Sequence, residues 1–170
     1  ALFGTALAGG VAAPLSTFST PTELEILLRQ SAAKVLIFER RILKKDFGEA
    51  LAQIEPSLEK VGPGEIASKN LPFLRHIVAV DSAGNSGGIE GWHAFLARGA
   101  KVARDLILAR SAQIAPADPG VLFFSSGSTG KPKGILSAHR GVCLQLWRWK
   151  QWHNIPEIVR TWCANGLFWS

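Results

Sequence analysis

The sequence predicts an α/β fold, a layered Rossmann-like domain with a mainly parallel sheet flanked by helices. Three apolar runs of four residues, at 35–38, 77–80 and 121–124, are separated by segments that carry apolar residues at helical spacing. Continuous runs of this length are typical of strands buried on both faces. Strands that alternate with helices are typical of parallel sheets, so we expect all three runs to lie in one sheet.

The composition agrees with one folded domain. The chain has 170 residues, of which 47% are hydrophobic and 19% are charged, so it has enough apolar material for a core and too little charge for a disordered chain. Lys and Arg number 19 against 13 Asp and Glu, which gives a net charge of +6. This balance permits an anionic partner such as a nucleotide, a nucleic acid or a membrane surface.

The number and spacing of the cysteines and histidines argue against a scaffold held by disulfides and against one held by a metal ion. Two cysteines, Cys143 and Cys163, are too few for a disulfide framework, so we expect a reducing compartment, the cytoplasm. The chain has no C-x-x-C pair and only four scattered histidines, so we expect no metal site.

The first 22 residues carry no charge, which raises the question of a membrane segment. The stretch consists mostly of small residues, contains Pro14 and has no basic flank, so it predicts neither a secretory signal nor a membrane-spanning helix. We expect a helix end, a stop at Gly9 and Gly10, and a short strand at 11–15. The lack of Met and Tyr and the start at Ala1 indicate a piece excised from a longer protein.

The remaining elements follow from helix-start signals and apolar spacing. Thr20 and Glu23 form a capping-box pattern around Pro21, and Leu24 and Leu27 continue the helix at the right spacing. The segments expected after it are a weaker helix at 45–59, a loop at 82–88, helices at 89–97, 102–109 and 138–152, a connector at 114–120 and a strand at 160–164.

Residues 125–134, here called the Gly/Ser segment, follow the third apolar run directly. Three glycines let the backbone approach a ligand closely, hydroxyl and backbone N–H groups offer hydrogen bonds to an anion, and two lysines add positive charge. This combination predicts a cradle for a polyphosphate at the carboxyl end of a strand, where parallel sheets bind ligands. The alternative is a solvated linker, which rarely follows a buried strand directly.

Three common site patterns do not fit the Gly/Ser segment. A P-loop fails because Ser125 stands in place of its first glycine and Pro132 follows Lys131. The dinucleotide pattern G-x-G-x-x-G is absent. A nucleophile elbow around Ser128 has Ser126 in place of its first glycine, and the chain offers no obvious triad to serve it.

The string FFSSGSTGKPKG at 123–134 closely resembles the signature of the adenylate-forming (AMP-binding) enzyme superfamily. This superfamily includes acyl-CoA synthetases, peptide-synthetase adenylation domains and luciferases, and the chain is most similar to an acyl-CoA synthetase or fatty-acid-CoA ligase. His139 and Arg140 resemble the usual continuation of the signature, and the stretches at 10–15 and 31–37 are similar to the family as well. The resemblance covers nearly the whole chain. One departure is Ser125, where Thr is commoner, and this change keeps the hydroxyl group.

The resemblance implies an ATP-dependent acid–thiol ligase that uses ATP with Mg²⁺ and CoA. The family activates a carboxylic acid as acyl-AMP, releases pyrophosphate and transfers the acyl group to CoA. Residues 1–170 would be part of the large N-terminal AMP-binding domain of a longer enzyme, with no second domain present. The adenine and ribose contacts, most of the acyl pocket and a catalytic lysine lie further along in the family, so we expect no catalytic residue in this chain, which alone is expected to be inactive.

The same resemblance assigns the Gly/Ser segment to the phosphates of ATP, which it would stabilise by positioned donors and charge. Ser126, Ser128, Thr129 and Lys133 are the expected main contacts. The full set of implied ATP phosphate-binding residues is Ser125, Ser126, Gly127, Ser128, Thr129, Gly130, Lys131, Lys133 and Gly134, with His139 as a further candidate.

A run of tryptophans and basic residues at 147–152 leaves other interpretations open. Such a mixture can stack nucleic-acid bases or lie at a membrane interface, whereas a helix that packs Leu144 and Trp147 on the sheet or on further chain is simpler. We keep two alternatives: an amino-acid adenylation domain, and a basic, Trp-bearing nucleic-acid or membrane-binding module. The expected partners are a carboxylic acid, ATP, CoA and the rest of the same protein, with no nucleic acid and no membrane span.

Overall fold

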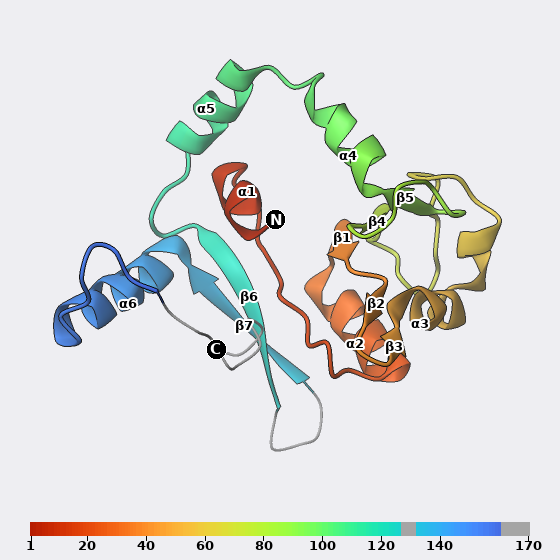
Figure 1. The fold of residues 1–170 in the computed structure, drawn as a ribbon, viewed down its shortest axis with the longest axis horizontal. Coiled ribbons are helices and arrows are strands. Elements are labelled where there is room, and N and C mark those ends of the chain that lie inside the picture. Colours follow the sequence, from red (N-terminus) through yellow and green to blue (C-terminus); the bar gives the residue numbers. More distant parts are fainter. Residues whose placement is uncertain (127–131, 161–170) are drawn as a thin grey trace. The chain divides into compact units, whose positions relative to one another are not determined.

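A computed structural model describes residues 1–126 and 132–160 of the chain (Figure 1). The chain divides into two units, which we describe one at a time. The sheet unit comprises Thr17–Arg104, and the hairpin unit comprises Ala1–Ser16 together with Asp105–Ser170. Helices and a parallel sheet occur together in the sheet unit, which confirms the predicted fold class.

The sheet unit is built on a parallel three-stranded sheet with the order β1-β4-β5. Its strands are β1 (Val35–Phe38), β4 (His76–Ala79) and β5 (Ile89–Gly91). The central strand β4 is buried, with Ile77 and Val78 both 0% exposed. Within the part of the chain that the structure describes, β1 pairs with β4 alone, and Val35 is 43% exposed. Burial on both faces is therefore confirmed for β4 and wrong for β1, because β1 is an edge strand.

The helices of the sheet unit supply most of its core. They are α2 (Pro21–Ser31), α3 (Phe47–Ile54), the 3₁₀ helix η1 (Pro56–Glu59) and α4 (Trp92–Gly99). Leu24 and Leu27 on α2 and Leu51 on α3 are buried. Burial of one such side chain contributes roughly 1.5–3 kcal/mol. Among the described residues, Val121 is the one buried apolar side chain that belongs to the hairpin unit, so the core lies in the sheet unit.

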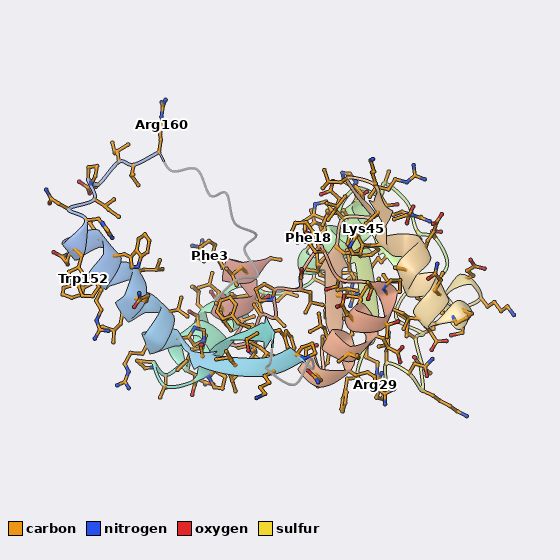
Figure 2. All side chains as sticks on the ribbon, turned by 90° about the horizontal axis from the view of Figure 1, so that it is seen from below. Phe3, Phe18, Arg29, Lys45, Trp152 and Arg160 are labelled. Atoms are coloured by element: carbon orange, nitrogen blue, oxygen red, sulfur yellow. The ribbon has the colours of Figure 1, made fainter. Side chains whose placement is uncertain are left out.

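The predicted capping box fixes the start of α2. The hydroxyl of Thr20 accepts a hydrogen bond from the N–H of Glu23 at 3.3 Å, and the carboxylate of Glu23 accepts one from the N–H of Thr20 at 2.7 Å. Pro21 stands at the first helical position, where no N–H partner is needed. Figure 2 shows Lys45 beside Phe18, whose carbonyl accepts a hydrogen bond from the ammonium group at 2.6 Å and ties down the chain before α2.

The helix predicted at 45–59 is shorter than expected. Its first two residues form β3 (Lys45–Asp46), which pairs with β2 (Arg41–Ile42) in an antiparallel hairpin. The carboxylate of Asp46 accepts a hydrogen bond from the N–H of Glu49 at 3.0 Å, so Asp46 caps α3 and sets its start. The helix ends before Pro56, which opens η1.

The helix predicted at 89–97 also begins later. Ile89 lies opposite Ile77 in parallel register, so the first three residues form β5 and α4 starts at Trp92. The side chain of Asn85, in the predicted loop at 82–88, accepts a hydrogen bond from the N–H of Gly91 at 2.9 Å and holds the end of this strand. The sequence pattern thus wrongly predicts a helix for three residues of a buried strand.

The hairpin unit contains two antiparallel strands and the helix that follows them (Figure 1). Its elements are α1 (Leu2–Leu7), β6 (Pro119–Ser126), β7 (Pro132–Ala138) and α6 (His139–Trp152), and α5 (Arg104–Ala112) begins at the boundary between the units. The helix expected at 138–152 is confirmed as α6. Gly9 has φ +72° after α1, in agreement with the predicted glycine stop.

Three expectations for this unit need correction or fall outside the described residues. The strand expected at 11–15 is reduced to a single parallel bridge between Ala12 and Val121. The helix expected at 102–109 starts two residues later, at Arg104, and continues to Ala112. Of the strand expected at 160–164, Arg160 belongs to no strand and the other residues lie outside the described ranges.

The third apolar run is a strand, but its predicted place is wrong. Residues 121–124 belong to β6, which pairs with β7 in a two-stranded antiparallel sheet instead of joining β1 and β4. The five residues between β6 and β7 are enough for a hairpin, whereas parallel neighbours need a crossover of about a dozen residues or more. The strand that leads into the Gly/Ser segment, β6, is therefore followed directly in the chain by its antiparallel partner β7.

Candidate functional site

The Gly/Ser segment lies at the connected end of the β6–β7 hairpin. Ser125 lies opposite Lys133, and Ser126 lies opposite Pro132. The residues that join these last pairs fall outside the described ranges: Gly127, Ser128, Thr129, Gly130 and Lys131. The structure thus brings the described residues of the Gly/Ser segment together at one end of one hairpin.

Ser125 and Lys133 share one face of this hairpin, because directly opposed residues of antiparallel strands project to the same side. Ser125 is half-buried and Lys133 is exposed. None of the ion pairs between described residues involves Lys133. A hydroxyl and an ammonium group on one face can together bind an anion by charge-assisted hydrogen bonds.

Pro132 fits its strand because its position needs no hydrogen bond to β6. The N–H of Leu122 donates to the carbonyl of Ala12 at 2.8 Å, on the edge of β6 away from β7. Bonded and non-bonded pairs alternate along an antiparallel ladder, so Leu122, Phe124 and Ser126 form the non-bonded pairs with β7. Pro132 faces Ser126, where its missing N–H removes no hydrogen bond of the ladder.

Gly134 has a packing role that sequence reasoning missed. A Cβ atom at this position would lie 3.1 Å from Cδ1 of Leu122 and 3.6 Å from Cε1 of Phe124. These two side chains cover the face of the hairpin opposite to Ser125, because neighbouring strand residues alternate between faces. The absence of a side chain at Gly134 lets them pack against the backbone of β7.

His139 lies at the other end of the hairpin. It follows Ala138, which pairs with Pro119, six residues along β7 from Pro132. A strand rises about 3.4 Å per residue, so the two ends of β7 are roughly 20 Å apart. This separation favours a packing role for His139 over contact with a phosphate.

The first N–H groups of α6 are already used within the protein. The N–H of His139 donates to the carbonyl of Asp118 at 3.0 Å, and the N–H of Arg140 donates to the carbonyl of Pro116 at 2.8 Å. The carboxylate of Asp118 accepts a hydrogen bond from the N–H of Ala115 at 2.8 Å and closes the turn that supplies these carbonyls. Sequence reasoning missed Asp118, and the signal was an Asp in a Pro-containing connector, where such turns are common.

An apolar groove of about 580 Å³ runs between this connector and α6. Its apolar lining includes Ile114, Pro116, Cys143, Leu144 and Trp147. Leu144 is 42% exposed and Trp147 is 60% exposed, so the packing of both on the sheet, expected from the sequence, is not observed in the described part of the chain. The indole at the last residue of α6, Trp152, is 77% exposed (Figure 2).

The carboxyl groups with shifted pKa values belong to the sheet unit, where they stabilise helix starts. The N–H of Glu49 lowers the pKa of Asp46, and the hydroxyl of Ser57 lowers the pKa of Glu55. Within residues 1–126 and 132–160, no group of three His, Cys, Asp or Glu side chains is placed to hold a metal ion. In the same ranges, no helix combines the length and apolar character needed to cross a bilayer.

The family model and the curated proteins that match this chain agree with one another. The model of the AMP-binding enzyme family matches residues 1–170. The 3-[(3aS,4S,7aS)-7a-methyl-1,5-dioxo-octahydro-1H-inden-4-yl]propanoyl:CoA ligase of Mycobacterium tuberculosis is 33% identical over 161 residues, which cover 95% of this chain and 28% of that protein. The human mitochondrial medium-chain acyl-CoA ligase ACSF2 is 28% identical over 168 residues, which cover 96% and 27%. The chain thus spans about a quarter of the length of these relatives.

Two solved structures have a fold similar to that of this chain. The anthranilate CoA ligase AuaEII, in complex with anthranoyl-AMP, matches with a TM-score of 0.51 and 28% identity over 83% of this chain and 21% of that chain. A red-emitting luciferase from Phrixothrix hirtus matches with a TM-score of 0.57 and 19% identity over 88% and 25%. The luciferase supports the fold alone, whereas AuaEII is also related in sequence.

Proposed function

Because the chain belongs to the family of AMP-binding enzymes, we propose that it forms part of an ATP-dependent ligase that joins a carboxylic acid to CoA. The observation that carries the proposal is the connected end of the hairpin, where Ser125 lies opposite Lys133 beside the family-like signature. A hydroxyl and an ammonium group on one face, next to a glycine-rich connection, suit a polyphosphate.

The proposed reaction has two steps. A carboxylate oxygen of the acid attacks the α-phosphorus of ATP, which enters as its Mg²⁺ complex. The bond from this phosphorus to the oxygen that bridges to the β-phosphate breaks, and pyrophosphate leaves with that oxygen. The CoA thiol then gives up its proton and attacks the acyl carbon, and AMP leaves as the thioester forms.

The part of this chain in the reaction is electrostatic. Negative charge grows on the departing pyrophosphate, and donors that are already in position stabilise it more in the transition state than in the ground state. We assign Lys131 to attracting ATP by charge and the glycines to close approach of the backbone. The side chains assigned to the phosphates are Ser126, Ser128, Thr129 and Lys133, with Ser125 beside them.

CoA is the proposed thiol acceptor because the two curated relatives are named as CoA ligases. The adenylate step is supported by AuaEII, whose structure contains an acyl-AMP. An amino-acid adenylation domain remains the alternative within the enzyme class. Formation of an acyl-CoA from free CoA, ATP and a carboxylic acid by the intact protein would separate the two.

We assign residues 1–170 to part of the large AMP-binding domain, supported by the family match and by the share of the relatives that the chain spans. The rest of the protein would then be its partner and would supply the adenine, ribose and acyl contacts that the resemblance implies. The proposed compartment is the cytoplasm, although the ACSF2 relative is named as mitochondrial. Microscopy of the tagged intact protein checks this assignment.

Exchange of labelled pyrophosphate into ATP, dependent on an added carboxylic acid, tests the proposed function. We expect the intact protein to catalyse exchange and Lys133→Ala to lower the rate on the order of a hundredfold or more, the usual effect of losing one transition-state donor. Lys101→Ala is the control, because Lys101 is an exposed lysine in the sheet unit. Equal rates for all three proteins would contradict the proposal.

The exposed tryptophans of α6 favour a second candidate, binding to single-stranded nucleic acid or to an anionic membrane. Trp147, Trp149 and Trp152 are 60%, 54% and 77% exposed, and Arg148 and Lys150 lie between them on the helix. Helices rich in basic residues and Trp can bind anionic membranes, and exposed aromatic side chains beside basic residues can stack on nucleic-acid bases. Salt-sensitive binding to either, unaffected by changes in the Gly/Ser segment, would support this candidate.

A further inference from the structure

The imidazole ring of His139 lies against the backbone at the base of the hairpin. A Cβ atom added to Gly120 would lie 2.7 Å from Nδ1 and 2.9 Å from Cε1 of His139, distances that real Cβ atoms do not show. The ring thus occupies the space that a side chain at position 120 would need. Nε2 of His139 is buried and has no hydrogen-bond partner among the described residues, so no described hydrogen bond of Nε2 holds the ring, which lies against Gly120.

Gly120 is also the extra residue of a β-bulge. Pro119 pairs with Ala138 and Val121 pairs with Ser137, so β6 has one residue more than β7 between these two pairs. A bulge sets the register of every pair that follows it along the hairpin. The ring of His139 therefore lies on the residue that determines this register.

The register beyond the bulge decides whether Ser125 lies opposite Lys133. Because strand side chains alternate between faces, a slip of one residue would pair Ser125 with a neighbour of Lys133 and turn the ammonium group to the other face. The hydroxyl and ammonium groups would then no longer act on the same ligand. The connection between the strands would also gain or lose a residue.

We propose that His139 is a positioning residue that fixes the register of the hairpin through Gly120 and thereby shapes the phosphate site at the other end of β7. This inference rests on the proposed function of the Gly/Ser segment. His139 acts through the strand pairing and does not touch the substrate.

A disulfide across the hairpin reports the register without any activity assay. Leu122 lies opposite Leu136 in a non-bonded pair, where Cα atoms are about 4.5 Å apart, within the range of disulfides. In the intact protein with Cys143→Ser and Cys163→Ser, we expect Leu122→Cys with Leu136→Cys to oxidise readily. Adding His139→Ala should lower the disulfide yield several-fold. His139→Asn keeps a planar group near Gly120 and should restore it.

Two glycine variants test the same contact from the other side. Gly120→Ala places a methyl group where the ring of His139 lies, so the disulfide yield should fall as it does with His139→Ala. Gly141→Ala is the matched control, because a Cβ atom there meets nothing within 4 Å. A yield that is equal for alanine and histidine at position 139, or a fall that is equal for both glycine variants, would overturn the proposal.

Pyrophosphate exchange then links the register to the site. We expect His139→Ala to raise the KM for ATP on the order of tenfold or more, since a misplacement of about 1 Å can cost on the order of a hundredfold. The KM for the acid should stay unchanged, and His139→Asn should restore the KM for ATP. A lower melting temperature with an unchanged KM for ATP would overturn the proposal.

Lys133→Ala separates this inference from the proposed function. If Lys133→Ala leaves exchange unchanged, the proposed function fails, and with it the phosphate role of the register. If Lys133→Ala lowers exchange while His139→Ala and Gly120→Ala leave the KM for ATP unchanged, the positioning role alone fails. If His139→Ala does not fold, the disulfide yield and the KM for ATP of Gly120→Ala are compared with those of Gly141→Ala and His139→Asn. The proposal is overturned if Gly120→Ala does not differ from the other two variants.

Discussion

Lys133 is anchored in a way that a loop lysine is not. It belongs to β7, and its pairing with Ser125 fixes its backbone on one face of the hairpin. A side chain that extends from a fixed backbone loses less conformational freedom when it binds a ligand. Lys131 lies outside the described residues, and the proposal assigns it only to attracting ATP by charge. The two lysines should accordingly respond differently to substitution.

We expect Lys131→Ala to lower acid-dependent pyrophosphate exchange less than Lys133→Ala does. If Lys131 only attracts ATP by charge, its effect should fade as salt is added, because exposed charges are screened over about 8–10 Å at ordinary ionic strength. The effect of Lys133→Ala should persist. Exchange rates measured across a salt series check this contrast, and parallel salt curves for the two variants would contradict it.

Thr129→Ala should lower exchange far more than it lowers stability. Thr129 belongs to the predicted phosphate contacts, and surface substitutions usually change the free energy of unfolding by no more than about 0.5 kcal/mol. Loss of one positioned donor in the transition state can cost about 2.7–4 kcal/mol. Exchange assays alongside thermal melts of the intact protein test this expectation, and near-normal exchange with unchanged melting would reduce the segment to a linker.

At the scale of elements, short polar devices decide where helices begin. Asp46 is both the last residue of β3 and the cap of α3. Its carboxylate accepts a hydrogen bond from the N–H of Glu49 and forms an ion pair with Arg41 at 3.1 Å. The hydrogen bond from Glu49 is the main reason why the pKa of Asp46 lies below its usual value. Folding therefore favours the charged form of Asp46, and the charged form in turn stabilises the folded state.

Substitution at Asp46 should separate capping from charge. Asp46→Ala is expected to lower the free energy of unfolding by about 1 kcal/mol, whereas Asp46→Asn keeps a capping oxygen and should lower it less. Because the folded-state pKa is lowered, the charge stabilises the fold above the unfolded-state pKa of about 3.9 and loses this effect as the pH falls through the folded-state value. Melting curves of wild type and Asp46→Asn should converge in acid, and a constant gap would refute the charge effect.

The sequence predicted elements well where the signal is local. The box of Thr20 and Glu23 and the span of α6 are read from neighbouring residues, and both are confirmed. The partner of an apolar run is not a local property, so residues 121–124 were correctly predicted as a strand and placed in the wrong sheet. The sequence did not predict β5 because this strand has only three residues, Ile89–Gly91, and α4 follows it with no residue between them.

For the candidate site, the sequence indicated which residues gather but not how. Of the signature at 125–134, the described residues lie at one end of the hairpin, and their role as phosphate contacts stays a prediction. The sequence did not predict the contacts that hold the hairpin. The packing of Gly134 under Leu122 and the turn closed by Asp118 depend on residues about 12 to 24 positions apart or on a connector with no regular period. Such contacts follow from register, which only the fold defines.

At the scale of the whole molecule, the two units differ in how many of their apolar side chains are buried. Nearly all of the buried apolar side chains among the described residues belong to the sheet unit, whereas the hairpin unit leaves most of the large apolar residues of β7 and α6 exposed. Apolar side chains that lie exposed together on a strand and a helix are typical of a surface that another part of a structure covers. This chain spans 28% and 27% of its two curated relatives, so these relatives contain much more chain than is present here.

By itself, the 170-residue chain is expected not to form an acyl-adenylate. It spans about a quarter of its curated relatives, and the resemblance places the adenine, ribose and acyl contacts elsewhere in the family. The purified chain should therefore show no acid-dependent pyrophosphate exchange under conditions in which the intact protein does. Exchange by the chain alone would mean that the active site has been assigned to the wrong part of the protein.

The outer edge of β7 has a practical consequence for anyone who handles this chain. Among the described residues, β7 pairs with β6 alone, and Ile135 and Leu136 on it are 44% and 58% exposed. An apolar strand with one unpaired edge is a template for strands of other molecules. Light scattering of the isolated chain should therefore rise with protein concentration, and Leu136→Lys, which places a charge on this strand, should suppress the rise and improve recovery after refolding.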